Sequence, residues 1–77
     1  MTNTHIADEL LRQARSAAAI GDNLYRVRAL RQAALVVQAL DEPVATILAH
    51  EGVHGLLEKP GIGPSLAKRI AALAERN

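Results

Sequence analysis

The sequence predicts an all-α protein: a compact bundle of four to five helices that ends in two helices joined by a tight hairpin. Apolar residues recur at helical spacing over most of the chain, and alternation typical of a strand never exceeds a few residues. Helix breakers divide the chain at Gly21, at Asp41-Glu42-Pro43 and at 60–64. Seventy-seven residues make one domain, 1–77, and a chain this short buries only about 60% of its unfolded surface.

The first two helices are expected on either side of Gly21. Asn3 or Thr4 can cap the first helix, and Gly21 suits the left-handed position that ends it. Asn23 can cap the second helix, which should run to about Leu40. In each helix one face is apolar and forms the core: Ile6, Leu10, Ala14 and Ala17 in the first, and Val27, Leu30, Ala33, Ala34, Val37 and Leu40 in the second.

A short third helix is expected from Pro43 to about 51–52, with Val44, Ile47 and Leu48 turned inward. One or two helical turns should follow over 53–58. The stretch Pro60-Gly61-Ile62-Gly63-Pro64 cannot continue a helix, because its prolines lack backbone donors and its glycines favour turns. The last helix should begin at Pro64, and Ile62 should point inward as an apolar plug between the two helices.

A hairpin followed at once by a helix start directs unpaired N–H groups and the positive end of the helix dipole at one place, which favours a phosphate. The candidate donors are the backbone N–H groups of Gly61, Ile62, Gly63, Ser65 and Leu66. Lys68 and Arg69 lie one turn further on, within reach of flanking phosphates. The alternative is that the hairpin merely connects two core helices. Its glycine spacing fits neither the dinucleotide fingerprint nor a nucleotide-binding loop.

The charge balance limits how the chain can bind nucleic acid. Nine Lys and Arg stand against eight Asp and Glu, for a net charge of +1, so any DNA contact should come from a local patch. Arg28 and Arg31 are favoured for that patch, because acidic residues at helical spacing from them occur only near the ends of their helix. Tyr25 is the single aromatic residue, which argues against an aromatic platform for single strands.

Other composition features indicate a cytoplasmic protein without a membrane segment. The chain has no cysteine, which fits a reducing compartment. Its apolar runs are too short to span a bilayer, and its polar N-terminus does not have the pattern of a signal peptide.

The segment Lys59-Pro60-Gly61-Ile62-Gly63, followed by Leu66-Ala67-Lys68-Arg69-Ile70, resembles the helix-hairpin-helix DNA-binding motif, with Lys59 where that motif usually has leucine. Together with the stretch from Gly21 to Ala34, it is similar to the N-terminal domain of the family X DNA polymerases. The resemblance implies a small helical domain of DNA repair that binds gapped or nicked DNA near a 5′ phosphate without sequence preference. It also implies a separate repair or polymerase protein as partner. The domain itself is expected to be a monomer or weak homo-oligomer.

In several members of that family a lysine also removes a 5′ deoxyribose phosphate through a Schiff base. The matching position here is Arg69, whose guanidinium stays protonated and forms no productive imine. We therefore expect no enzyme activity, with a residual lyase using Lys68 as the alternative. Ser65, Arg26 and Gln32 also stand where members often carry lysine.

The resemblance further implies that main-chain carbonyls of the hairpin coordinate Na⁺ or K⁺ when DNA is bound. The matching carbonyls are those of Leu57, Lys59 and Ile62. The side chain of Lys59 is a further candidate for DNA contact.

The sequence suggests two other function classes, a zinc metalloprotease, which is disfavoured, and a protein-interaction module. His50-Glu51-Gly52-Val53-His54 matches a zinc-binding pattern that needs one unbroken helix, but Gly52 and Gly55 predict a boundary there, and only His5 or an unassigned carboxylate could be a third ligand. A protein-interaction module is the other class, because Leu24 and Leu35 are expected to be exposed.

Overall fold

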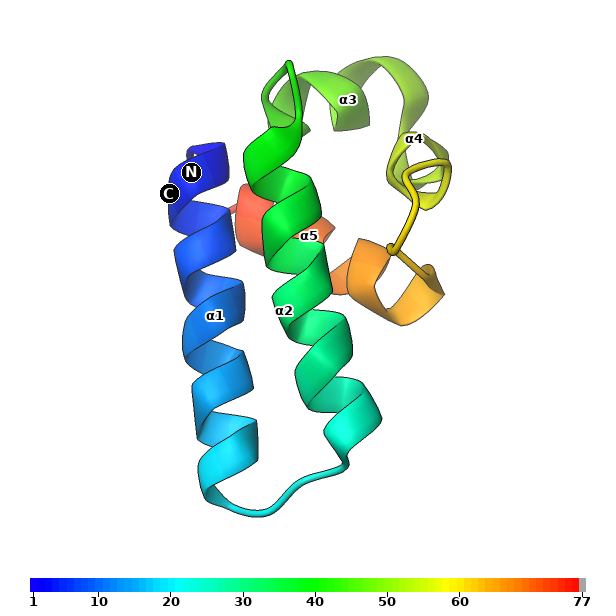
Figure 1. Ribbon diagram of the computed structural model, residues 1–77. Coiled ribbons are helices and arrows are strands. Elements are labelled where there is room, and N and C mark those ends of the chain that lie inside the picture. Colours follow the sequence, from blue (N-terminus) through cyan, green and yellow to red (C-terminus); the bar gives the residue numbers. More distant parts are fainter. Residues whose placement is uncertain (77) are drawn as a thin grey trace.

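The computed structural model describes residues 1–76 and confirms the all-α prediction (Figure 1). Within these residues there are five helices and no strand: α1 (Asn3–Ala19), α2 (Leu24–Ala39), α3 (Val44–Glu51), α4 (Val53–Leu57) and α5 (Pro64–Ala74). The long helices α1 and α2 form an antiparallel pair, and α5 crosses behind it in the view of Figure 1. Helices α3 and α4 carry the chain from the end of α2 to the hairpin before α5.

The turn between α1 and α2 follows from Gly21 and Asn23, as expected. Gly21 has a φ of 73°, and Gly21 and Asp22 donate their N–H groups back to the carbonyls of Ala18 and Ala17. Asn23 then caps α2, since its side chain accepts the Tyr25 N–H at 2.7 Å. This turn fixes the positions of the first residues of α2, which belong to the candidate site.

The cap of α1 differs from the prediction. The N-cap is Thr2, whose hydroxyl accepts the His5 N–H, and neither Asn3 nor Thr4 takes this role. Asn3 instead reaches across to α3: its Oδ1 accepts the Val44 N–H and its Nδ2 donates to the Glu42 carbonyl, both at 2.9 Å. Pro43, the N-cap of α3, has no side chain that could cap the helix. Asn3 of α1 supplies this cap instead.

The core is apolar throughout the described chain, with no buried polar or charged side chain. Four alanines of α1 and α2 are fully buried, and such small side chains allow packed helices to approach closely. Larger side chains from all five helices and the hairpin complete the core, among them Ile6, Leu10, Ile47, Leu56, Ile62, Ile70 and Leu73. Ile62 is 5% exposed, which confirms it as the plug of the hairpin.

The boundary between α3 and α4 falls at Gly52, which has a φ of 66°. His50 and His54 consequently lie on different helices, and the single helix that the zinc pattern requires is broken there. Gly55 is not part of the boundary; it is buried within α4. Across residues 1–76, no three His, Cys, Asp or Glu side chains gather closely enough to hold a metal ion. In the same part of the chain, no helix combines the length and apolar character needed to cross a membrane.

Candidate nucleic-acid interface

The hairpin before α5 is closed by two backbone hydrogen bonds. Lys59 N–H donates to the Leu56 carbonyl at 3.0 Å, and Ile62 N–H donates to the Lys59 carbonyl at 3.2 Å. Gly61 adopts a φ of 88° between them, a conformation that favours glycine. The expectation that the Ile62 N–H is free is therefore wrong, because the turn that buries its side chain also uses its donor.

Four other N–H groups of this segment remain unpaired within the described chain. They are those of Gly61, Gly63, Ser65 and Leu66. The first backbone bond of α5 runs from Ala67 N–H to the Gly63 carbonyl at 2.8 Å, and no side chain caps this helix. Pro64, at the first helical position, has no N–H to satisfy. The start of α5 thus presents donors and a partial positive charge without an internal acceptor.

A cleft of about 490 Å³ lies between the start of α5 and the start of α2. The hairpin touches α2 beside it, since a Cβ at Gly61 would come within 3.1 Å of Gln32 Cγ. Two arginines, Arg26 of α2 and Arg69 of α5, line the cleft, and so do the four residues with unpaired N–H groups. The complete lining is Tyr25, Arg26, Ala29, Leu30, Gly61, Gly63, Pro64, Ser65, Leu66 and Arg69.

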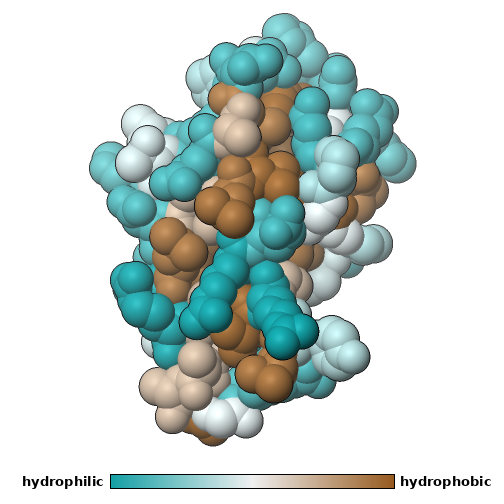
Figure 2. Space-filling model, in the orientation of Figure 1, coloured by the Kyte–Doolittle hydropathy of each residue, from teal (hydrophilic) through white to brown (hydrophobic). Residues whose placement is uncertain are grey.

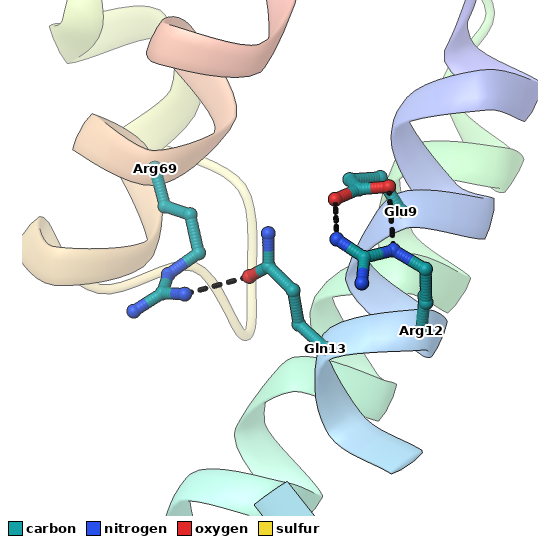
Figure 3. Close-up of polar contacts among 4 residues, drawn as sticks. All are labelled: Glu9, Arg12, Gln13 and Arg69. Atoms are coloured by element: carbon teal, nitrogen blue, oxygen red, sulfur yellow. Dashed lines mark hydrogen bonds and ion pairs between the residues drawn. The ribbon is translucent and has the colours of Figure 1, made fainter. Parts of the chain in front are cut away.

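The two arginines of the cleft are held differently. Arg69 is half-buried, and its Nη1 donates to Gln13 Oε1 of α1 at 2.6 Å (Figure 3). Arg26 is more loosely held, with its Nη1 3.9 Å from Asp22 Oδ2. Neither contact cancels the positive charge at the cleft, because Gln13 is uncharged and Arg26, whose side chain is 63% exposed, is 3.9 Å from its acidic partner.

Arg12 does not contribute to this site. It forms a pair with Glu9 on the same helix, as its spacing predicts, with its Nε 3.0 Å from Glu9 Oε2 (Figure 3). The hydrogen bond from Arg12 lowers the pKa of Glu9.

The sequence pattern of the helix-hairpin-helix domain family matches residues 1–77, the whole chain. The chain belongs to this family. Helix-hairpin-helix domains generally bind DNA without sequence specificity. No curated protein and no solved structure matches the chain significantly.

Of the two lysines predicted for DNA contact, one lies beside the cleft and the other lies away from it. Lys68 is exposed and lines a shallow recess with Pro64, Ser65 and Arg69, next to the cleft. The side chain of Lys59 is half-buried on the hairpin, outside both hollows.

Arg28 and Arg31 do not line the cleft, although the sequence favoured them over other arginines. At 100° per residue, Arg31 lies about 140° around α2 from Arg26. The structure instead brings Tyr25 and Arg26 to the site, and reasoning from charge and spacing alone missed both. The signal that pointed to Arg26 was the family resemblance, in which this position is often lysine.

Three main-chain carbonyls of the hairpin are expected to coordinate a monovalent cation, and most of their acceptor capacity is free. Those of Leu57 and Ile62 accept no hydrogen bond from the described residues, and that of Lys59 accepts one, from Ile62 N–H. Each of the three oxygens therefore keeps at least one lone pair for a further partner.

Proposed function

We propose that this helix-hairpin-helix domain holds the sugar-phosphate backbone of DNA at the cleft, next to the 5′ phosphate of a gap or nick. One observation carries the proposal: the unpaired N–H groups of Gly63, Ser65 and Leu66 lie at a cleft that Arg26 and Arg69 also line. Backbone donors at a helix start and guanidinium groups both favour phosphate oxygens.

Each part of the site has a distinct role in the proposed complex. The donors of α5 fix the position of one phosphate, and the helix dipole favours its negative charge. Arg69 and Arg26 approach the same or a neighbouring phosphate from opposite walls of the cleft. Gly63 leaves space for the strand, since nothing lies within 4 Å of where its Cβ would be.

Phosphate contacts carry no sequence information, so the proposed binding is non-specific. The net charge of +1 leaves only a local basic patch, and a single domain should bind with a Kd of about 10⁻⁴ to 10⁻⁶ M. A terminal 5′ phosphate carries more charge than an internal one, and it is reached without opening a duplex. Gapped and nicked DNA should therefore bind more tightly than an intact duplex.

Within the family, we assign the domain to the type found at the N-terminus of family X DNA polymerases. The support is the stretch from Gly21 to Ala34, whose first part builds the α2 wall of the cleft. The assignment implies a role in DNA repair beside a separate repair or polymerase protein.

The proposed action is positioning without chemistry. By the family X resemblance, the position of the Schiff-base lysine is Arg69, whose guanidinium forms no productive imine. Lys68 does not line the cleft. A lyase acting through Lys68 would be trapped on abasic DNA by borohydride in the wild-type protein and not in Lys68→Ala. The proposal predicts no trapping in either.

A monovalent cation at the hairpin belongs to the same proposal. The carbonyls of Leu57, Lys59 and Ile62 supply hard oxygen ligands, and DNA would add a phosphate oxygen. Replacing K⁺ or Na⁺ by a bulky organic cation at constant ionic strength should then weaken DNA binding beyond the general salt effect.

The experiment is a titration of fluorescently labelled DNA at about 50 and 200 mM salt. The substrates are a gap with a 5′ phosphate, the same gap without it, a nick, a single strand and an intact duplex. We expect the phosphorylated gap to bind best and all affinities to fall with salt. No binding to any substrate at the lower salt would reject the proposal.

Gly63→Val sharpens this test. Gly63 has an extended backbone with a φ of −88° and open space at its Cβ, so a larger side chain fits the folded protein. That side chain would stand where the DNA strand must approach. The variant should melt like the wild type and lose most of its affinity for DNA. Undiminished binding would place the DNA elsewhere.

A further inference from the structure

The outward side of α2 carries a stripe of four residues: Leu24, Arg28, Arg31 and Leu35. Their spacing of four, three and four residues places them along one face of the helix. Leu24 and Leu35 are 67% and 60% exposed, and both arginines are exposed. We call these four residues the outer stripe.

The outer stripe is separate from the proposed DNA site. The cleft is lined by Tyr25, Arg26, Ala29 and Leu30 of α2, and by none of the stripe residues. Arg31 lies about 140° around the helix from Arg26, and the smallest separation is about 60°, between Arg28 and Tyr25. The cleft and the outer stripe therefore lie on distinct parts of the solvent face of α2.

The arginines of the stripe have no acidic partner within residues 1–76. The ion pairs in this part of the chain join Arg12 to Glu9 and Arg26 to Asp22. In Figure 2 strongly hydrophilic side chains lie along the middle of the molecule, where α2 runs, with apolar surface above and below them. Two unpaired positive charges thus stand between two exposed leucines.

This combination fits a protein better than DNA. Phosphates would satisfy the arginines, but two exposed leucines gain nothing from a polar, hydrated sugar-phosphate surface. A helix laid along α2 with apolar and acidic residues on one face would bury both leucines and pair both arginines.

A second copy of the chain is a poor occupant. The order Leu, Arg, Arg, Leu with spacing four, three and four reads the same in both directions. An alignment of two stripes that pairs both leucines of one copy with both leucines of the other therefore sets arginine against arginine. Like charges at such an interface oppose association.

We propose that the outer stripe docks an acidic amphipathic helix of a partner protein. Leu24 and Leu35 are separated by about 16 Å along the helix axis. The partner helix presents apolar residues at that separation and two carboxylates between them, opposite Arg28 and Arg31. The domain then links DNA on one side of α2 to a protein on the other.

The test uses a synthetic helical peptide of about 18 residues, long enough for a stable helix in an alanine-rich background. It carries Leu, Glu, Glu and Leu at the spacing of the stripe, and a control peptide has both glutamates replaced by lysine. Titration into isotope-labelled protein, followed by amide chemical shifts, reports affinity and location together. We expect saturable shifts along the outer face of α2 with the acidic peptide and none with the lysine peptide.

A charge swap tests the pairing itself. The double variant Arg28→Glu, Arg31→Glu should bind the acidic peptide at least about tenfold more weakly and should bind the lysine peptide instead. A control with the same net charge, Arg15→Glu with Arg76→Glu, should behave like the wild type toward both peptides. Thermal melting establishes that both double variants fold.

Several outcomes would overturn the proposal. Each of three results for the wild type contradicts it: the protein shows no saturable chemical shift at millimolar acidic peptide, it binds the two peptides equally well, or it shows shifts only at the cleft. Light scattering that shows a dimer formed through the stripe would assign it to a second copy. A loss of DNA affinity in Arg28→Glu, Arg31→Glu that is absent in the control double variant would assign the stripe to DNA.

Discussion

At the scale of single residues, the two glycines of the hairpin have different physical roles. Gly61 has a φ of 88°, and a Cβ there would come 3.1 Å from Gln32 Cγ and 3.5 Å from Val36 Cγ2. Gly63 has an ordinary extended backbone and open space at its Cβ position. The first glycine is therefore required by the fold, and the second keeps the approach to the α5 donors clear.

Gly61→Ala should destabilise the protein by about 1–2 kcal/mol, because a side chain at positive φ is strained and also presses on Gln32. Gly63→Ala is the matched control and should change the free energy of unfolding by no more than about 0.5 kcal/mol. Urea denaturation of both variants measures this difference. Equal stability of the two would contradict the roles assigned to the glycines.

The bond between Gln13 and Arg69 gives a second prediction at this scale. Gln13→Glu places a carboxylate within hydrogen-bond reach of the Arg69 guanidinium, although the two residues are 56 positions apart in the sequence. The new charge should neutralise Arg69 and lower the affinity for DNA. Because one phosphate contact is lost, the slope of log K against log salt should become shallower by about 0.9.

Binding titrations at several salt concentrations measure the slope. Gln13→Ala is the control, since it removes the bond without adding charge and should leave the slope close to that of the wild type. A Gln13→Glu variant with undiminished affinity and slope would exclude Arg69 from the DNA contact.

At the scale of helices, the start of α3 depends on a residue of α1. Pro43 has no side-chain donor or acceptor, and the part-buried Val44 N–H is satisfied by Asn3 Oδ1. The same side chain donates to the Glu42 carbonyl. Asn3 therefore fastens the connection after α2 to the first turn of α1.

Asn3→Ala should cost about 1–2 kcal/mol, because it removes two hydrogen bonds and leaves the Val44 N–H unpaired. Thr2→Ala is the control at the neighbouring position. It removes an exposed cap of α1 and should cost less. Hydrogen exchange should also show faster exchange in α3 for Asn3→Ala than for Thr2→Ala. A larger loss of stability in the Thr2 variant would contradict this assignment.

Much of the element structure could be predicted from local signals. Gly21, Asn23, Pro43, Gly52 and Pro64 mark helix ends within a residue or so of where the structure places them. The cap of α1 could not be chosen, because Thr2, Asn3 and Thr4 are equivalent locally. A contact 41 residues away in sequence takes Asn3 for another purpose.

At the scale of the whole molecule, α2 separates two surfaces. One side of its first turns forms the cleft with the start of α5, and its outward side carries the outer stripe. Sequence periodicity distinguishes the core face of α2 from its solvent face, but it does not say which part of the solvent face meets the hairpin. That depends on how α5 packs across the pair.

This is why the hairpin could be predicted and the second wall of the cleft could not. The donors at Gly63, Ser65 and Leu66 follow from a local motif, whereas the choice of Arg26 over Arg28 and Arg31 follows from packing. The prediction of a free Ile62 N–H was wrong for a local reason. The turn that buries the Ile62 side chain uses its N–H in a hydrogen bond to the Lys59 carbonyl.

The central claim is tested most directly by an amide chemical shift map with an oligonucleotide that carries a gap and a 5′ phosphate. The account predicts saturable shifts centred on Gly63, Ser65 and Leu66, smaller shifts at Arg26 and Arg69, and unshifted amides along Arg28, Arg31 and Leu35. Shifts centred on the outer stripe, or none at the start of α5 at saturating DNA, would contradict it.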